Sequence, residues 1–244
     1  MKKFNRPSNH PFGKPNEERR QFMKNGLLLG SLAGIAGLGL LPGCEKEEGE
    51  DVAPPEDLMR EHGALNRILL IYDTCRIHLS TGESFDVSVL NNSAQIIRNF
   101  IEDYHEKLEE NYLFPRFEKA NLLTDLVATL RKQHKAGRDV TAQIIQLANM
   151  NSLSNEDNAK QMIELLRSFN TMYRPHEARE DTVLFPALRK IISRNEFYSL
   201  GEDFEKKEHE LFGQDGFESV VEKVADLEKK LGIYDLSQFT PQKL

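Results

Sequence analysis

Two related stretches decide the fold: HEKLEENYLFP at residues 105–115 and HEAREDTVLFP at residues 176–186. Each begins with His-Glu, has a glutamate four residues after the histidine and then a second acid, and ends in Leu-Phe-Pro. A solvent-exposed charged helix face needs neither a histidine at a fixed distance from a glutamate nor an identical apolar ending. The repeat therefore indicates an internal duplication whose two copies complete one site.

The sequence around these stretches has helical periodicity. Leu58, His62, Leu65, Leu69 and Tyr72 recur at spacings of four and three, which is typical of one face of a helix. The few glycines, the absence of tryptophan and the charged content of 29 % also favour amphipathic helices over a β-sandwich or barrel.

Four long helices follow from this periodicity, over about residues 56–79, 85–117, 122–150 and 155–192. The connections between them are short, so consecutive helices are antiparallel. The predicted fold is all-α: an up-down-up-down four-helix bundle over residues 56–195. Residues 196–244 are expected to form a C-terminal helical extension packed on the bundle, with one helix over about residues 202–232.

Three prolines interrupt the predicted rods. Pro115 lies in the second helix, and Pro175 and Pro186 lie in the fourth. Proline removes a backbone donor, so each is expected to bend its helix. The repeated Leu-Phe-Pro ending is accordingly interpreted as core packing combined with a helix bend.

Four histidines fall at one level of this bundle. His62 and His105 are equally far along the chain from the predicted turn between the first two helices, and His134 and His176 are equally far from the turn between the last two. His105 and His134 are also equally far from the middle turn. At about 1.5 Å per residue, all four lie roughly 30 Å from one end of the bundle and about 20 Å from the other. Chance placement would rarely satisfy all three conditions.

Each repeat also places a glutamate one helical turn after its second histidine: Glu109 follows His105, and Glu180 follows His176. Positions i and i+4 lie about 40° apart around a helix, so each pair points the same way. Two buried carboxylates without partners would be costly. A pair of metal ions removes that cost, with two histidines on each ion and the two glutamates as bridges. Nitrogen and oxygen donors without thiolate favour two non-haem iron ions, with manganese next and zinc after it.

Three further residues are candidates for the surroundings of the site. Glu106 and Glu177 recur in both repeats, about 100° around the helix from the ligand direction. They are predicted to be hydrogen-bond partners of the ligands or an additional ligand at one metal. His209 lies in the run KKEHE and is either a further ligand or ligand partner from the last helix, or part of a solvated charged run.

The sequence resembles the hemerythrin-like HHE cation-binding family. The resemblance lies in the residues that match the di-iron ligands of that family: His62, His105, Glu109, His134, His176 and Glu180. The resemblance covers about residues 56–190. It implies a four-helix bundle that holds a non-haem di-iron centre, with the two glutamates as bridging carboxylates.

Two positions depart from the pattern of oxygen-carrying hemerythrins. Those proteins have a fifth histidine where this chain has Arg138, and they use an aspartate at the position of Asp181. Glu180 is preferred here because Glu109 has the same offset in the other repeat. The set of four histidines and two glutamates is more similar to iron-centre-repair proteins that respond to nitric oxide, which typically carry an N-terminal cysteine-bearing domain that this sequence lacks.

Residues 1–55 differ in kind from the rest. The run RRQFMK at residues 19–24 precedes an apolar, glycine-spaced run over residues 26–41 and resembles a twin-arginine export signal. LPGC, which ends at Cys44, resembles a lipoprotein box in which Cys44 becomes lipidated; the alternative is a soluble exported protein cut near Gly43. Residues 1–44 are therefore a predicted signal peptide with a lipobox-like cleavage site, and residues 45–55 an acidic tether. These features predict export to the cell envelope or periplasm with a lipid anchor in the membrane.

The composition excludes some other classes of partner. The net charge is −7, and no basic cluster occurs after the leader, which argues against nucleic acid. Only Cys75 remains after the predicted cleavage, so an internal disulfide is not expected. The domain must be held by packing or by metal.

Three functional hypotheses follow. The leading one is a lipid-anchored di-iron protein that binds oxygen, nitric oxide or iron itself, because twin-arginine export of folded proteins suits a centre loaded with metal beforehand. The alternative is an enzyme that reduces nitric oxide or peroxide, or oxidises ferrous iron. Such an enzyme needs an electron donor, and the sequence shows no second cofactor motif. A metal-free helical interaction module is the third hypothesis and would leave the four level histidines as a coincidence.

Overall fold

The computed structural model describes residues 53–213 and 216–241. All regular elements in this part of the chain are helical, which confirms the all-α prediction. The predicted signal peptide, Cys44 and the tether as far as residue 52 lie outside the described residues. None of the described helices combines the length and the apolar character that crossing a membrane requires.

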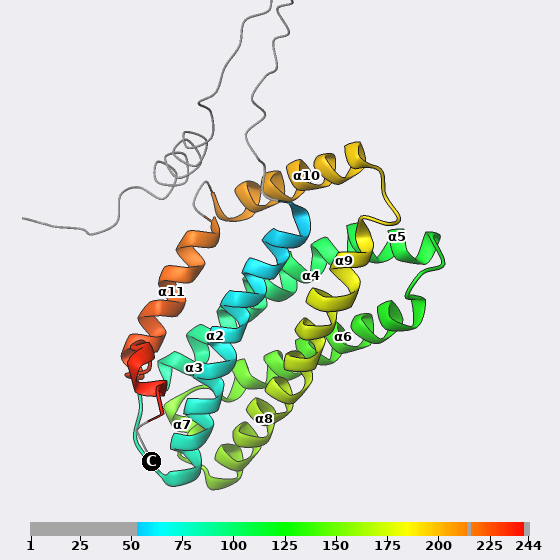
Figure 1. The fold of residues 1–244 in the computed structure, drawn as a ribbon. Helices are drawn as coiled ribbons and strands as arrows, with labels where there is room; N and C mark the ends of the chain where they lie inside the picture. The colour runs from blue at the N-terminus through cyan, green and yellow to red at the C-terminus, as the bar shows by residue number, and fades with distance from the viewer. Residues whose placement is uncertain (1–52, 214–215, 242–244) are drawn as a thin grey trace, which may run out of the picture. The chain divides into compact units, whose positions relative to one another are not determined.

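Four rods form the bundle (Figure 1). The first is α2 (Pro54–Thr81) and the third is α6 (Thr124–Leu147). The second is made of α3 (Ser88–Ile96), η1 (Ile97–His105), α4 (Glu106–Leu108), η2 (Glu109–Leu113) and α5 (Phe114–Lys119). The fourth is made of α8 (Glu156–Arg179), η3 (Glu180–Leu184) and α9 (Phe185–Leu188). Here η1, η2 and η3 are π-helical segments, and the short α7 (Met150–Leu153) lies between the third and fourth rods.

Local sequence explains where the rods end. Gly82 closes α2 in the left-handed region (φ 73°), where a side chain would be strained. Asn121 and Leu123 also have positive φ and turn the chain between the second and third rods. Asn155 caps α8, its side chain accepting hydrogen bonds from two backbone N–H groups of the first turn. The rod ends lie close to the predicted bounds, within about one helical turn.

The rods close on one another around an apolar core. α2 packs against α8 and against the second rod, and α6 packs against α8 and α3, as expected for the predicted up-down-up-down bundle. Large side chains such as Tyr72, Phe100 and Phe169 are fully buried between the rods. The free Cys75 is buried in the same core.

The chain continues beyond the bundle in a helical extension, as predicted. The extension contains two helices, α10 (Arg194–Phe212) and α11 (Gly216–Lys230), rather than the single one expected, because Gly213 (φ 80°) ends α10. Both helices pack against α2, and α11 also packs against α3 (Figure 1). Arg67 of α2 binds both carboxylate oxygens of Glu228 in α11, at 2.9 and 2.5 Å. The extension therefore covers one side of the bundle.

Candidate metal centre

The six residues predicted as ligands come together inside the bundle, and all are at most 4 % exposed. Each rod supplies one histidine. The rings of His62 and His105 are 4.8 Å apart between centroids, and those of His134 and His176 are 5.0 Å apart. We call His62 and His105 the first half of the centre, and His134 and His176 the second half.

The two glutamates link these halves. Oε2 of Glu109 lies 3.9 Å from Nε2 of His105 and 3.4 Å from Nε2 of His134. Oε2 of Glu180 lies 3.4 Å from Nε2 of His62 and 3.2 Å from Nε2 of His176. Each carboxylate thus reaches one histidine of each half, as a carboxylate placed between two metal ions would.

The donor atoms of the centre fit metal ions. Both carboxylate oxygens of Glu109 and of Glu180 are buried without a hydrogen-bond partner among the described residues, and so is Nε2 of His134. Such groups are costly in an apolar core unless something binds them. Among the six ligands, two groups have donor atoms within 4.8 Å of one another: Glu109 with His134, His176 and Glu180, and Glu109 with His62 and His105. Cations at these positions would satisfy the orphaned oxygens.

Outer hydrogen bonds fix every imidazole in the same orientation. Nδ1 of each ring has an oxygen partner: Asp181 at 2.7 Å for His62, Glu61 at 2.6 Å for His105, Glu110 at 3.1 Å for His134, and Gln133 at 2.9 Å for His176. An Nδ1–H that donates outward leaves the lone pair of Nε2 directed at the centre. The rings are therefore oriented as metal ligands.

These outer partners follow the duplication, although sequence reasoning did not identify them. Glu61 and Gln133 each precede the first histidine of their repeat, and Glu110 and Asp181 each follow the bridging glutamate. Asp181 was considered only as an alternative ligand, and the structure places it on Nδ1 of His62 instead. The second acid shared by both quoted stretches was the signal that could have revealed Glu110 and Asp181.

The other repeated glutamates, Glu106 and Glu177, bond to polar side chains of neighbouring rods, and the donor atoms of Glu106, Glu110 and His134 lie within 4.8 Å of one another. Glu106 accepts a hydrogen bond from the Tyr173 hydroxyl at 2.7 Å and pairs with Arg138 at 2.6 Å. Glu177 accepts one from the Asn66 amide. Both glutamates are buried, but neither hydrogen-bonds to a ligand histidine in the described structure. They anchor polar side chains of neighbouring rods beside the centre.

The Leu-Phe-Pro ending proves to belong to the site. The Phe114 ring stacks on His134 (5.5 Å, 23° between planes), and the Phe185 ring stacks on His62 (5.6 Å, 18°). A π-helical segment precedes each phenylalanine and carries the bridging glutamate at its start. Proline cannot donate to the helix, so the hydrogen-bond pattern changes there. The ending therefore positions ligand histidines of neighbouring rods as well as packing the core.

In the protein without metal, the pKa values of the two buried glutamates shift in opposite directions. Burial and the neighbouring charge of Glu180 raise the pKa of Glu109 well above its usual range. Burial also opposes ionisation of Glu180, but His176 and His62 hold its pKa below the usual range. For His62, burial disfavours the cation, yet the hydrogen bond to Asp181 and the nearby negative charge of Glu180 raise its pKa to about 10. Glu109 is therefore harder to ionise than Glu180 in the protein without metal.

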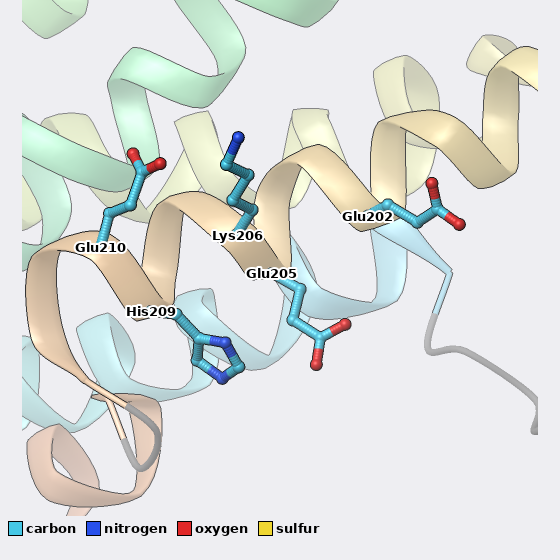
Figure 2. Close-up of a pocket in the computed structure, with 5 residues that line it drawn as sticks. All are labelled: Glu202, Glu205, Lys206, His209 and Glu210. Atoms are coloured by element: carbon cyan, nitrogen blue, oxygen red, sulfur yellow. The ribbon is translucent and has the colours of Figure 1, made fainter.

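His209 is not brought to this centre. It lies exposed on α10 beside Glu202, Glu205, Lys206 and Glu210, around an open hollow of about 420 Å³. Figure 2 shows Glu210 and Lys206 on one side of α10 and Glu205 and His209 on the other. The arrangement matches the solvated charged run that was its alternative interpretation.

The bundle and its inward-facing imidazoles and carboxylates define a helical cation-binding protein. The family model "Hemerythrin HHE cation binding domain" matches residues 53–188 and, a second time, residues 125–235. The chain belongs to this family. The second match is displaced from the start of the first by the same offset that separates His134 from His62.

Similar proteins occur in mycobacteria. The chain is 47 % identical over 222 residues to "Uncharacterized protein Rv1995" of Mycobacterium tuberculosis and to "Uncharacterized protein Mb2018" of Mycobacterium bovis, covering 86 % of this chain and 87 % of each relative. No solved structure matches the chain.

Proposed function

We propose that this protein is a non-haem di-iron protein that binds a small diatomic ligand, oxygen or nitric oxide, or iron itself at a carboxylate-bridged centre. The observation that carries the proposal is the set of four buried oxygens of Glu109 and Glu180, which have no hydrogen-bond partner among the described residues. Oε2 of each glutamate lies within 3.9 Å of Nε2 of two histidines. Iron fits this donor set best, and manganese is the next candidate.

The residues around the centre have separable tasks. The four histidines would supply nitrogen ligands to the metal, and Glu109 and Glu180 would supply carboxylate oxygens. Glu61, Glu110, Gln133 and Asp181 hold the imidazoles in the ligating tautomer. When bound, iron would supply Lewis-acid and redox chemistry toward a small ligand.

We further propose that the protein works in the cell envelope, exported through the twin-arginine route and held by a lipid on Cys44. The support is the sequence pattern of the leader alone. Mass spectrometry of the membrane fraction tests this: a lipidated N-terminal Cys44 is expected, and it should disappear in Cys44→Ala. An unmodified mature chain in the soluble fraction would contradict the anchor.

Metal analysis and spectroscopy test the function. The purified bundle is expected to contain two irons per chain and to show the absorption of a ferric pair. After anaerobic reduction, a spectrum that returns to the reduced form when oxygen is removed supports reversible binding. Rapid, irreversible oxidation supports the alternative function, an enzyme that reduces nitric oxide or peroxide or oxidises ferrous iron with an external electron donor. A chain that takes up no metal would contradict both functions and favour a metal-free interaction module.

A further inference from the structure

A small hollow lies directly beside the second half of the centre. It has a volume of about 140 Å³ and lies between α6 and α8, where Thr129, Gln133, Pro175, His176 and Arg179 line it together with two leucines of α6. Thr129, Pro175 and Arg179 are solvent-exposed, whereas His176 is only 4 % exposed. The hollow therefore runs from the surface to a residue of the centre.

The ring of His176 separates this hollow from the metal positions. Its Nδ1 is bonded to Oε1 of Gln133, a hollow-lining residue, and its Nε2 lies 3.2 Å from Glu180. Because the amide oxygen of Gln133 is engaged by His176, its NH₂ group remains available as a donor. Arg179 adds a positive charge at the mouth and has no hydrogen-bond or ion-pair partner among the described residues. These groups suit a small anion or a polarisable diatomic molecule rather than a cation.

The duplication shows that the hollow is specific to the second half. The offset that relates His176 to His105 places Tyr104 at the position of Pro175, and Leu108 at that of Arg179. Tyr104 and Leu108 are each only 3 % exposed. The Tyr104 ring packs edge-on against Phe212 of α10, with centroids 5.4 Å apart. A large side chain and a helix of the extension therefore occupy the corresponding place beside the first half.

We infer that this hollow is the entrance to the centre, and that a ligand of two or three heavy atoms enters past His176 and binds at the His134–His176 half. The inference rests on the proposed di-iron function. The first half, closed by Tyr104 and the extension, then serves as the retained metal position. The difference between proline and tyrosine at this repeat position leaves one side of a duplicated site open.

Filling the hollow tests the inference. Pro175→Tyr introduces the side chain that closes the other half, and Thr129→Trp fills the same space from α6. With azide as the probe on the diferric protein, stopped-flow absorption should show association and dissociation both slowed at least about tenfold, because entry then requires a breathing motion. The dissociation constant should stay unchanged, since an entrance affects both rates equally.

Two controls isolate the effect of filling. Pro175→Ala removes the proline without filling the hollow and should slow neither rate. Ala178→Tyr adds the same aromatic group to an exposed position of α8 that does not line the hollow. Wild-type azide rates in both Pro175→Tyr and Thr129→Trp, or a weakened affinity with unchanged association, would overturn the entrance. Iron content is measured first: a wild-type chain without iron would contradict the proposed function itself.

Discussion

The two halves of the centre have the same ligands but different surroundings. Beside the first half lie three carboxyl groups, those of Glu61, Asp181 and Glu177, and none of them forms an ion pair with lysine or arginine among the described residues. Burial raises the pKa of Glu61 and of Glu177 to about 8. Asn66, which bonds Glu177, is neutral. This half is acidic and covered.

In the second half, cations pair with the acidic side chains, and a hollow connects this half to the surface. Gln133 replaces the carboxylate of Glu61, and Arg138 pairs with both Glu106 and Glu110, at 2.6 and 2.7 Å. Lys107 adds a second cation on Glu110. The comparison teaches that the duplication kept the four histidines and two glutamates while their surroundings diverged, so two metal ions bound here would not be equivalent. The acidic half should hold the more positive ion more tightly.

The largest effect is expected from Arg138→Leu. It leaves the buried Glu106 without its cation and weakens the hold on Glu110, which should lower the free energy of unfolding by about 3–5 kcal/mol. Asn66→Leu is the matched change in the first half and removes only a neutral partner, at a cost of about 1–3 kcal/mol. Urea denaturation of the metal-free proteins at neutral pH measures both. Equal losses would mean that the charge difference between the halves does not contribute to the free energy of unfolding.

The next largest difference in stability is expected between alanine substitutions at two glycines. A Cβ on Gly137 would overlap the Tyr173 hydroxyl oxygen, whereas a Cβ on Gly63 would meet nothing within 4 Å. Gly137→Ala should therefore cost about 1–3 kcal/mol through overpacking. Gly63→Ala should stabilise the exposed face of α2 by up to about 1 kcal/mol. Thermal denaturation compares them, and a harmless Gly137→Ala would show that Tyr173 does not need this close approach.

Exchanging the residue types of Glu61 and Gln133, which bond Nδ1 of His105 and His176, tests whether these partners make the two halves differ in metal affinity. Glu61→Gln should weaken metal binding at the first half about tenfold, and Gln133→Glu should strengthen it at the second half by a similar factor, because the outer partner sets the basicity of the imidazole. Competition with a chelator of known affinity measures both changes. Shifts of the same sign in the two variants would contradict this role.

The smallest expected effect is on the number of protons that the protein releases when it binds metal. The hydrogen bond to Asp181 and the nearby charge of Glu180 outweigh burial and raise the pKa of His62 to about 10, whereas burial lowers that of His134 to about 4. At neutral pH His62 must lose a proton to bind metal and His134 need not, so affinity should rise with pH by about tenfold per unit for that proton. Calorimetry in buffers of different ionisation enthalpy should show less proton release in Asp181→Asn and no comparable loss in Glu110→Gln. Equal release in both variants would contradict the assignment.

The fold and the meeting of the six predicted ligands could be predicted because the repeat constrains both. Three turns and one offset place His62, His105, His134 and His176 at one level without any tertiary information. The bridging role predicted for the two glutamates follows from their equal offset in the repeats, and the family resemblance implies the same role. That these residues hold iron stays a prediction.

Other features could not be predicted because they depend on contacts between rods. Glu61 and Gln133 hold histidines on other rods, and the change from acid to amide hides their equivalence in the sequence. The stacking of Phe114 on His134 likewise joins two rods. The hollow is lined jointly by residues of α6 and α8, so the sequence of neither helix reveals it.

The most direct test of the central claim is the iron content of the wild-type chain and of the double variant Glu109→Ala/Glu180→Ala. Glu118→Ala, at an exposed position of the second rod, is the matched control. If the glutamates bridge two irons, the wild type and the control hold two irons per chain and the double variant holds almost none. No metal in the wild type, or an unchanged iron content in the double variant, would contradict the account.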